Sequence, residues 1–273
     1  MDIKKIMDGI SPLWGICRFE DVEAHLIECR AKNRLPDNAR SVIVACFPYL
    51  LDEENYKNSN VSKYAAVTDY HDVAINRLQR ACDEFKKLFP ESSFAPFADN
   101  SPIPEVRAAM HAGLGVRGKN SLLITKDYGS YVFLGEIVTD LKIPVNQVQT
   151  DICIGCGRCI DACPARAITQ NGVDGTKCLS AITQKKGELT EKEKELMISC
   201  GCAWGCDICQ DICPMNRNAA KTDIKEFTSS CIPVLTCKTS LDGRAYAWRG
   251  KKVVERNLSI ISKEKTADEH SGF

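Results

Sequence analysis

The stretch Cys153-Ile-Gly-Cys-Gly-Arg-Cys-Ile-Asp-Ala-Cys-Pro164 decides the fold of the second half of this chain. Its spacing is C-x2-C-x2-C-x3-C-P, in which three neighbouring thiolates hold one [4Fe-4S] cluster while the fourth reaches a second cluster. Four cysteines can also bind zinc, but zinc sites rarely use three cysteines at successive two-residue intervals before Cys-Pro. The pattern therefore predicts a bacterial ferredoxin-like domain with two clusters, and zinc is the weaker alternative.

A second, shorter cysteine motif follows at Cys206-x2-Cys209-x3-Cys213-Pro214. It has one cysteine fewer than a full repeat, and we expect Cys178 to supply the missing ligand. In the crossed connectivity of two-cluster domains, cluster one would bind Cys153, Cys156, Cys159 and Cys213, and cluster two would bind Cys163, Cys178, Cys206 and Cys209. Cys200 and Cys202 could be a spare ligand pair or buried thiols beside a cluster, and the sequence leaves both readings open.

The distribution of cysteines indicates the compartment. Of 16 cysteines, ten lie within residues 151–213 and only four within residues 1–150. The segment Met1–Asp8 has two acids and no apolar run, so no secretory signal is expected. The longest apolar stretch, 42–51, is too short to span a bilayer and contains a proline. We therefore expect a cytoplasmic protein without membrane contact, whose thiols serve metal or redox chemistry rather than disulfides.

Composition limits the other possibilities. The chain has 273 residues, enough for one or two domains, and 44% of them are apolar, enough for a real core. The 36 basic residues balance 36 acidic ones, which excludes a polycation and a highly charged disordered chain. Any contact with a nucleic acid must therefore come from a local basic patch.

The first 150 residues read as an α/β domain. A β-branched apolar run predicts a buried strand over 39–47, and apolar residues at three- and four-residue steps predict a helix over 68–89, closed by Pro90. We expect further elements in the order strand 93–98, helix 103–112, strand 121–125 and strand 131–138, the last two joined by a hairpin at 126–129. Clusters carry electrons but do not select a substrate. This domain must therefore supply the chemistry, unless the protein is only an electron carrier.

The predicted fold is α+β, with an α/β domain at residues 1–148, a two-cluster ferredoxin-like domain at 149–220 and a basic closing segment at 221–273. Residues 188–195, where lysines alternate with acids, are expected to form an exposed helix. The glycines Gly113, Gly115 and Gly118 at a helix-to-strand junction allow close approach to a ligand, but such triplets also occur in ordinary turns.

Several motifs together resemble the epoxyqueuosine reductase family, cobalamin-dependent iron-sulfur enzymes of tRNA modification. The resemblance runs from about residue 30 to about residue 260 and rests on the order and spacing of these motifs: Tyr64 with Asp69-Tyr-His71, Asp99-Asn-Ser-Pro102 with Glu105, Gly113-Leu-Gly115 with Gly118-Lys-Asn120, Tyr128 to Glu136, Cys153 to Pro164, Lys177 to Thr183, Gly205 to Pro214, Trp248-Arg-Gly250 and Arg256-Asn257.

The resemblance implies a cobalamin held base-off between a domain similar to that of reductive dehalogenases and the two-cluster domain. Electrons would pass through the clusters to cobalt, the epoxide of epoxyqueuosine would be reduced, and a carboxylic acid would protonate the departing oxygen before water is lost. Asp99 occupies the proton-donor position of the family. From the residues alone, a turn or N-cap aspartate is the preferred interpretation, and the resemblance reverses that preference. A partly buried carboxyl with a raised pKa would suit the donor role.

The same resemblance assigns the corrin contacts. Asn120, Leu123, Thr125 and Leu134 would line the corrin, together with Tyr70 or His71. His71 could instead be a histidine of the helix surface or core. Lys119 could meet a phosphate or propionamide, or only solvent.

The closing segment carries the expected tRNA surface. Residues 238–265 contain eight basic and three acidic residues. Tyr246 and Trp248 could stack on unpaired bases, although a solvated basic face is a comparable reading.

Two features depart from the family: Val116-Arg117 replace an aromatic and an aliphatic residue, and the chain stops at Phe273 without the helical repeats with which most members continue.

Three hypotheses follow. The first is a cobalamin-dependent reductase that converts epoxyqueuosine to queuosine in the tRNA anticodon loop, acting as a monomer with an external donor such as ferredoxin or flavodoxin. The second is an enzyme of the same architecture with another small substrate. The third is a two-cluster electron-transfer protein, which would bind no corrinoid.

Overall fold

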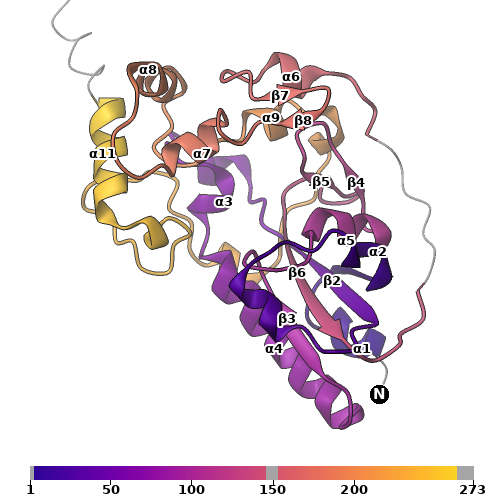
Figure 1. Ribbon diagram of the computed structural model, residues 1–273. Helices are drawn as coiled ribbons and strands as arrows, with labels where there is room; N and C mark the ends of the chain where they lie inside the picture. The colour runs from indigo at the N-terminus through magenta and orange to yellow at the C-terminus, as the bar shows by residue number, and fades with distance from the viewer. Residues whose placement is uncertain (1–2, 146–152, 263–273) are drawn as a thin grey trace, which may run out of the picture.

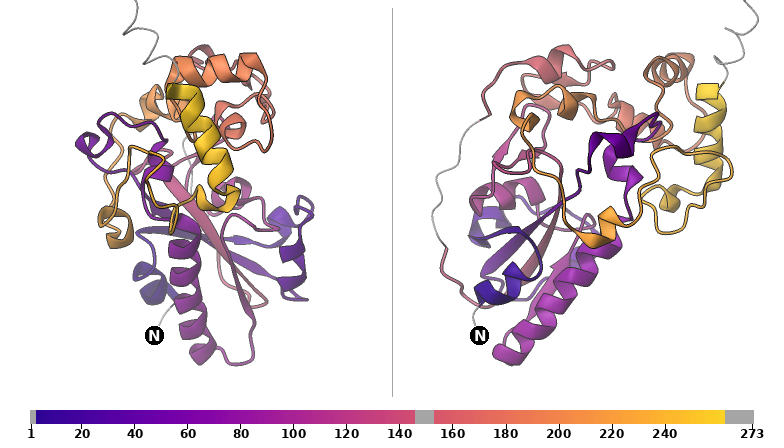
Figure 2. Two further views of the ribbon diagram at one scale, coloured as in Figure 1. Left: turned by 90° about the vertical axis from the view of Figure 1, so that its left-hand side faces the viewer. Right: turned by 180° about the vertical axis from the view of Figure 1, so that it is seen from behind.

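The computed structural model describes residues 3–145 and 153–262. A sheet with helices on both sides forms the lower part of Figure 1, and the mostly helical, cysteine-rich part lies above it. Figure 2 shows the same two parts from the side and from behind, with α11 (Lys251–Ser262) at the edge of the upper part. Within the part of the chain that the structure describes, no helix is long and apolar enough to cross a membrane.

The sheet has four strands in the order β1 (Leu13–Arg18), β2 (Ser41–Pro48), β6 (Val132–Thr139) and β3 (Phe94–Phe97). Each of the three pairings is antiparallel. The strands expected at 39–47, 93–98 and 131–138 are confirmed, with ends shifted by one or two residues. Because the sheet is antiparallel, the first domain is of the α+β kind and not a parallel α/β domain.

Helices cover both faces of this sheet, which explains why β2 is buried at all eight positions. On one face, Ile43, Ala45 and Phe47 pack with α4 (Tyr70–Leu88), beside which lies α1 (Ile3–Asp8). On the other face, alternate residues such as Val42 and Val44 pack with α5 (Glu105–His111), and α2 (Glu20–Glu23) lies against α5. The predicted helix over 68–89 is therefore confirmed as α4.

The turn predicted at 126–129 is present, because Thr125 and Gly129 form an antiparallel bridge across it, but it does not connect two paired strands. β5 (Leu123–Ile124) pairs with β4 (Val116–Arg117) and not with β6. β4 and β5 approach closely because residue 115 is glycine: a Cβ at Gly115 would lie 2.4 Å from the carbonyl oxygen of Ile124.

The cysteine-rich part consists of short elements. They are α6 (Arg158–Asp161), β7 (Ile168–Thr169), β8 (Gly172–Val173), α7 (Leu179–Thr183), α8 (Glu191–Cys200) and α9 (Ile208–Asp211), together with 3-10 helices at Pro214–Asn216 and Ala247–Arg249. α10 (Lys225–Thr228) packs through Phe227 in the core of the sheet, and two further 3-10 helices, Arg30–Arg34 and Glu53–Tyr56, belong to the N-terminal part. The helix expected at 188–195 begins at Glu191 and runs to Cys200, because the side chains of Thr190 and Glu193 form a capping box at its start.

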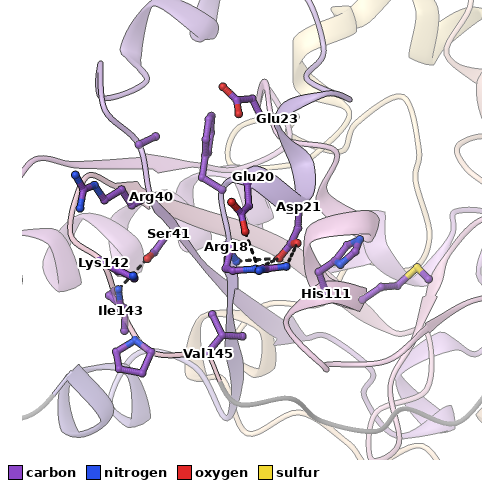
Figure 3. A pocket seen from close by; sticks show the side chains of 14 residues that line it. Arg18, Glu20, Asp21, Glu23, Arg40, Ser41, His111, Lys142, Ile143 and Val145 are labelled. Carbon is purple, nitrogen blue, oxygen red and sulfur yellow. Dashed lines mark hydrogen bonds and ion pairs between the residues drawn. The ribbon is translucent and has the colours of Figure 1, made fainter.

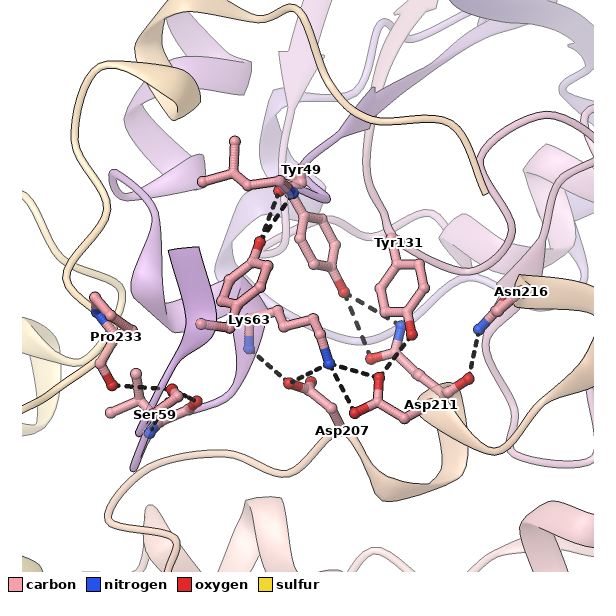
Figure 4. Close-up of polar contacts among 12 residues, drawn as sticks. Tyr49, Ser59, Lys63, Tyr131, Asp207, Asp211, Asn216 and Pro233 are labelled. Carbon is pink, nitrogen blue, oxygen red and sulfur yellow. Dashed lines mark hydrogen bonds and ion pairs between the residues drawn. The ribbon is translucent and has the colours of Figure 1, made fainter. Parts of the chain in front are cut away.

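Two kinds of contact join the two parts. The first is a buried apolar cluster. In it, Ala65 and Ala66 of α3 (Lys63–Ala66) and the preceding Val61 pack with Trp204 and Tyr246. Figure 4 shows the polar contacts: the backbone N–H of Lys63 donates to Asp207 at 2.6 Å, and the Lys63 ammonium pairs with Asp211 at 2.6 Å. Residues 1–148 and 149–220 thus share one core at this junction. The predicted boundary at 148/149 itself lies outside the described residues.

Candidate functional site

A cavity of about 420 Å³ lies at the junction of the two parts. The antiparallel domain contributes one wall, which includes the apolar side chains Leu123, Phe133 and Leu134. The cysteine-rich part contributes the facing wall, and four cysteines line it: Cys163, Cys178, Cys206 and Cys209. These four are the ligands expected for cluster two. The crossed connectivity requires Cys163 of the first motif to lie near Cys206 and Cys209 of the second, and all three line the same cavity.

The four cysteines expected for cluster one also lie together. Cys153, Cys156, Cys159 and Cys213 line a second, smaller cavity. All of them are free thiols. Among the described residues, no three of His, Cys, Asp and Glu stand close enough to hold a single metal ion; a cubane cluster is larger and takes its thiolates from the sides of a cavity. The two cavities with their four thiols each fit two [4Fe-4S] clusters.

Polar groups surround the expected ligands. The backbone N–H of Ala167 donates to the sulfur of Cys163 at 3.3 Å, a contact of the kind that tunes cluster potential. Asn120 lines both cavities and so stands between the two cluster positions. Cys200 and Cys202 line neither cavity, and they pack instead with α8 in an apolar cluster that includes Cys206. The structure thus favours the reading of these two cysteines as neighbours of the site.

Asp99 and His71 form an ion pair at the antiparallel wall. His71 Nε2 lies 3.2 Å from an oxygen of Asp99, and His71 Nδ1 lies 2.6 Å from an oxygen of Asp69, which also caps α4 by accepting the backbone N–H of His71. Burial alone would lower the pKa of His71, but the hydrogen bonds to Asp69 and Asp99 outweigh it and raise this pKa to about 9. The imidazole is therefore protonated at neutral pH.

The protonation expected for Asp99 is corrected by this contact. Its side chain is 60% exposed, and the hydrogen bond from His71 holds the pKa of the Asp99 carboxyl below its usual range, against the effect of partial burial. The raised pKa that we expected is therefore not found. At neutral pH the proton of this pair stays on the His71 imidazole, in the hydrogen bond to Asp99. The two residues thus hold one shared proton.

The backbone at Asp99 is also unusual. Its φ of 58° is left-handed, a conformation that aspartate tolerates better than most residues. The N-cap reading of Asp99 does not hold, because α5 begins after Pro104 and no side chain caps it. Strained backbone of this kind collects at functional sites. The strain therefore supports a functional reading of Asp99.

The residues expected to line the corrin separate into two groups. Tyr70, Asn120, Leu123 and Leu134 line the cavity. Thr125 and His71 are not among its lining residues: Thr125 donates its hydroxyl to the carbonyl of Gly129 in a buried turn, and His71 is held by the two aspartates. Sequence reasoning missed Tyr49, Tyr64, Phe133 and Gln210, which also line the cavity. Lys119 pairs with the side chain of Gln170.

The basic closing segment is only partly available for binding. Tyr246 is fully buried and Arg244 is 6% exposed, because the guanidinium of Arg244 donates to the carbonyl of Ala66. The expectation that Tyr246 stacks on bases is therefore wrong. Trp248 is 60% exposed, and the guanidinium of Arg249 lies 3.7 Å from its ring centroid. Lys263 and Lys265 lie outside the described residues.

A larger groove, of about 1160 Å³, opens at the end of β1 and is drawn in Figure 3. Three of its charged side chains pair with one another: Arg18 pairs with Glu20 and with Asp21, each at 2.7 Å. No cysteine and none of the expected site residues lines it. The cavity at the junction, where the predicted proton donor and the predicted cluster ligands meet, is therefore the candidate site.

Known proteins share this organisation. Residues 152–216 match the family model "4Fe-4S double cluster binding domain", and residues 30–100 match "Epoxyqueuosine reductase QueG, DUF1730". An epoxyqueuosine reductase of Lactococcus garvieae is 31% identical over 220 residues, which are 76% of this chain and 62% of that protein. The chain thus spans somewhat less than two thirds of the length of this relative.

Solved structures agree with these matches. The epoxyqueuosine reductase of Streptococcus thermophilus superposes with a TM-score of 0.77 at 27% identity, over 95% of this chain and 80% of that one. A reductive dehalogenase described as B12-dependent superposes with a TM-score of 0.50 at 19% identity, over 97% of this chain and 36% of that one. The second likeness concerns the fold alone. It confirms the expected fold, a dehalogenase-like domain followed by a two-cluster domain.

Proposed function

This chain belongs to the epoxyqueuosine reductase family, and we propose that it reduces the epoxide of epoxyqueuosine in the tRNA anticodon loop to the alkene of queuosine. One observation carries the proposal. In a single cavity, the wall that holds Asp99 faces the wall formed by Cys163, Cys178, Cys206 and Cys209. A reduction that expels oxygen needs both electrons and protons. The cysteine wall would deliver the electrons, and the wall that holds Asp99 would deliver protons.

The cofactors of this proposal are two [4Fe-4S] clusters and a cobalamin. Cys153, Cys156, Cys159 and Cys213 would hold the first cluster, and the four cysteines of the cavity would hold the second. The apolar lining of the cavity, with Tyr70, Leu123 and Leu134, suits the flat corrin, and Asn120 offers an amide for its polar edge. When bound, these groups supply single electrons at low potential to the substrate.

The protein's own residues would handle the proton. The Asp99–His71 pair would protonate the departing epoxide oxygen, and Asp69 orients the imidazole through its 2.6 Å contact. Because the pKa of His71 is raised to about 9, the pair holds its proton at neutral pH and loses it as the pH rises through that value. Turnover should therefore decline on the alkaline side.

We further propose that the substrate binds as tRNA and that an external donor such as ferredoxin or flavodoxin supplies electrons to a monomer in the cytoplasm. Trp248 is exposed beside Arg249, Lys251 and Lys252 on the outer edge of the upper part. An exposed indole can stack on an unpaired base while the cations meet phosphates. Their position supports a role in holding the anticodon loop.

The first test is a cofactor titration. The protein would be purified without oxygen, its clusters reconstituted, and cob(II)alamin added while its electron paramagnetic resonance spectrum is recorded. We expect conversion to the base-off form at one corrinoid per chain. If no corrinoid binds while the clusters are intact, the protein is an electron carrier.

The second test is the variant Asp99→Asn, assayed on an epoxyqueuosine-containing anticodon stem-loop with a chemical reductant. Loss of the donor should lower single-turnover rates by about 10²- to 10⁴-fold, with corrinoid and iron content unchanged. Asp72→Asn is the matched control, because Asp72 is an exposed aspartate in the first turn of the same helix as His71. Full activity of Asp99→Asn would refute the donor role.

A related reductase of another small substrate is the second candidate function. The fold shared with a reductive dehalogenase and the departure at Val116-Arg117, which form β4 beside α5, favour it. Base-off corrinoid without any turnover or binding of tRNA would select this alternative.

A further inference from the structure

The inference concerns the second proton of the reaction and rests on the proposed function. Conversion of an epoxide to an alkene breaks two C–O bonds, forms one C=C bond and releases the oxygen as water. The balance requires two electrons, from the external donor, and two protons. The Asp99–His71 pair holds only one proton at neutral pH, so the cavity needs a second source.

Glu105 stands beside that pair. It is the first residue of α5, it lines the cavity, and its Oε1 accepts the backbone N–H of Asp99 at 3.0 Å. Among the ion pairs of the described chain, none involves Glu105. The titratable groups that face it are Asp99 from the preceding loop, Tyr70 and His71 from α4, and Glu136 from β6. Three of these are acids or phenols, so His71 is the only cation among them, and the backbone N–H of Asp99 donates a hydrogen bond to a carboxylate at this position.

Glu136 lies behind Glu105, inside the protein. It is fully buried in β6, opposite Val44 of β2 and Phe97 of β3, and neither of its carboxyl oxygens has a hydrogen-bond partner. Side chains alternate along a strand, so Glu136 shares a sheet face with Leu134 of the cavity and points to the α5 side. A buried carboxyl without a cation favours its neutral form, and burial raises the pKa of Glu136 more than the nearby Ser101 side chain lowers it. As a neutral group, Glu136 brings no charge to the wall that holds Glu105.

We propose that Glu105, as a neutral carboxylic acid, donates the second proton to the departing oxygen. The first proton, from the Asp99–His71 pair, would go to the oxygen as the first C–O bond breaks. The second, from Glu105, would complete water as the second C–O bond breaks. Solvent protons would then restore both donors. Burial, and next the charge of Asp99, raise the pKa of Glu105 to about 8, which agrees with a neutral side chain at pH 7.

The kinetic test uses single turnover with the protein loaded with clusters and corrinoid, the anticodon stem-loop and excess chemical reductant. In the wild type, the rate should fall in two steps as the pH passes about 8 and then about 9. Glu105→Gln should remove the first step and lower the rate at neutral pH by about 10²-fold or more. Glu105→Asp keeps the acid and should recover part of the rate. Glu226→Gln is the control, because Glu226 pairs with Arg77 away from the cavity.

A second readout needs no turnover and no corrinoid. The infrared C=O band of protonated carboxyls would be followed against pH in the cluster-loaded protein. One band should disappear as the pH passes about 8 and be missing in Glu105→Gln. A second band should persist above that pH and be missing in Glu136→Gln. Glu226→Gln should retain both bands.

The outcomes separate the two proposals. If the wild type turns over and Glu105→Gln keeps both its rate and the step near pH 8, the second-donor role is overturned while the proposed function stands. The absence of an infrared band lost in Glu105→Gln would also overturn it, since Glu105 would then be ionised. If the wild type binds corrinoid but never reduces the epoxide, both proposals fall together. Loss of rate and step in Glu105→Gln, with rescue by Glu105→Asp, supports the role.

Discussion

The two walls of the cavity use carboxyl groups in opposite ways. On the antiparallel wall, Glu105 and Glu136 have no cationic partner among the described ion pairs, and Glu136 is fully buried. On the cysteine-rich side, Asp207 and Asp211 lie within the second cysteine motif and both contact Lys63. A cation beside a carboxyl favours its ionised form, and at Asp207 the charge of Lys63 opposes the burial that raises this pKa to about 6. In the proposed reaction, the carboxyls of one wall would supply protons, whereas those of the other wall join the two parts through Lys63.

In the proposed reaction, this division would also separate the source of electrons from the source of protons. The thiols lie on the wall that Lys63 fixes, and the Asp99–His71 pair lies on the wall that α4 and the loop before α5 build. A substitution on one wall should then leave the chemistry of the other wall unchanged, provided that the two walls stay joined. The predictions below test this independence.

Removal of one cluster should have the largest effect. Cys178→Ala deletes the one ligand expected for cluster two that lies outside both cysteine motifs, so the protein should lose one of its two clusters and, with it, all measurable turnover. Iron analysis and electron paramagnetic resonance measure the loss. The infrared bands of Glu105 and Glu136 should remain. Cys237→Ala, which removes an exposed thiol, is the control, and two intact clusters in Cys178→Ala would contradict the assignment.

Glu136→Gln should change stability in a pH-dependent way. Burial, and next the charge of Glu105, raise the pKa of Glu136 well above its ordinary value of 4.5. The folded protein thus keeps a proton that the unfolded chain releases, and wild-type stability falls as the pH rises above 4.5. Glutamine cannot ionise in either state. The Tm of the cluster-loaded variant should therefore match the wild type at acid pH and exceed it by several degrees at alkaline pH.

A Tm difference that does not change with pH would show that Glu136 is ionised or exposed in the folded protein. Glu226→Gln gives the opposite control, because the ion pair with Arg77 lowers the pKa of Glu226. Its removal should cost a little stability above the ordinary pKa of 4.5 and nothing well below it.

The attachment of the two walls should show the smallest effect. In Lys63→Met the ammonium that pairs with Asp211 at 2.6 Å is lost while most of the apolar stem remains. The pair is partly exposed, so we expect about 1 kcal/mol, or about 2–4 °C in Tm, with a smaller difference in high salt. Lys57→Met is the control, because Lys57 pairs with Glu54 at the surface. Equal stability of the two variants would show that the Lys63 contact does not fasten the domains.

Much of the fold could be predicted from local patterns. The apolar runs located β2, β3, β6 and α4 to within a few residues, because side-chain periodicity directly reflects which face of an element is buried. The turn after β5 was predicted at the right place, but the pairing was not, because β5 pairs with β4 while β6 pairs with β2 and β3 from distant parts of the chain. Tyr246 was misread for a similar reason. A basic, aromatic segment looks exposed until its packing against Trp204 is known.

The sequence by itself determined the family and a predicted set of cluster ligands, since motif order is a property of the chain and short cysteine spacings limit which sulfurs can reach one cluster. Only the tertiary structure decided the protonation of the acids. Asp99 is held ionised by His71 of α4, and Glu105 is held neutral by burial beside Asp99. A pKa depends on water, charge and hydrogen bonds within a few ångströms, and here those neighbours come from α4, β6 and the loop before α5, which are separated along the chain.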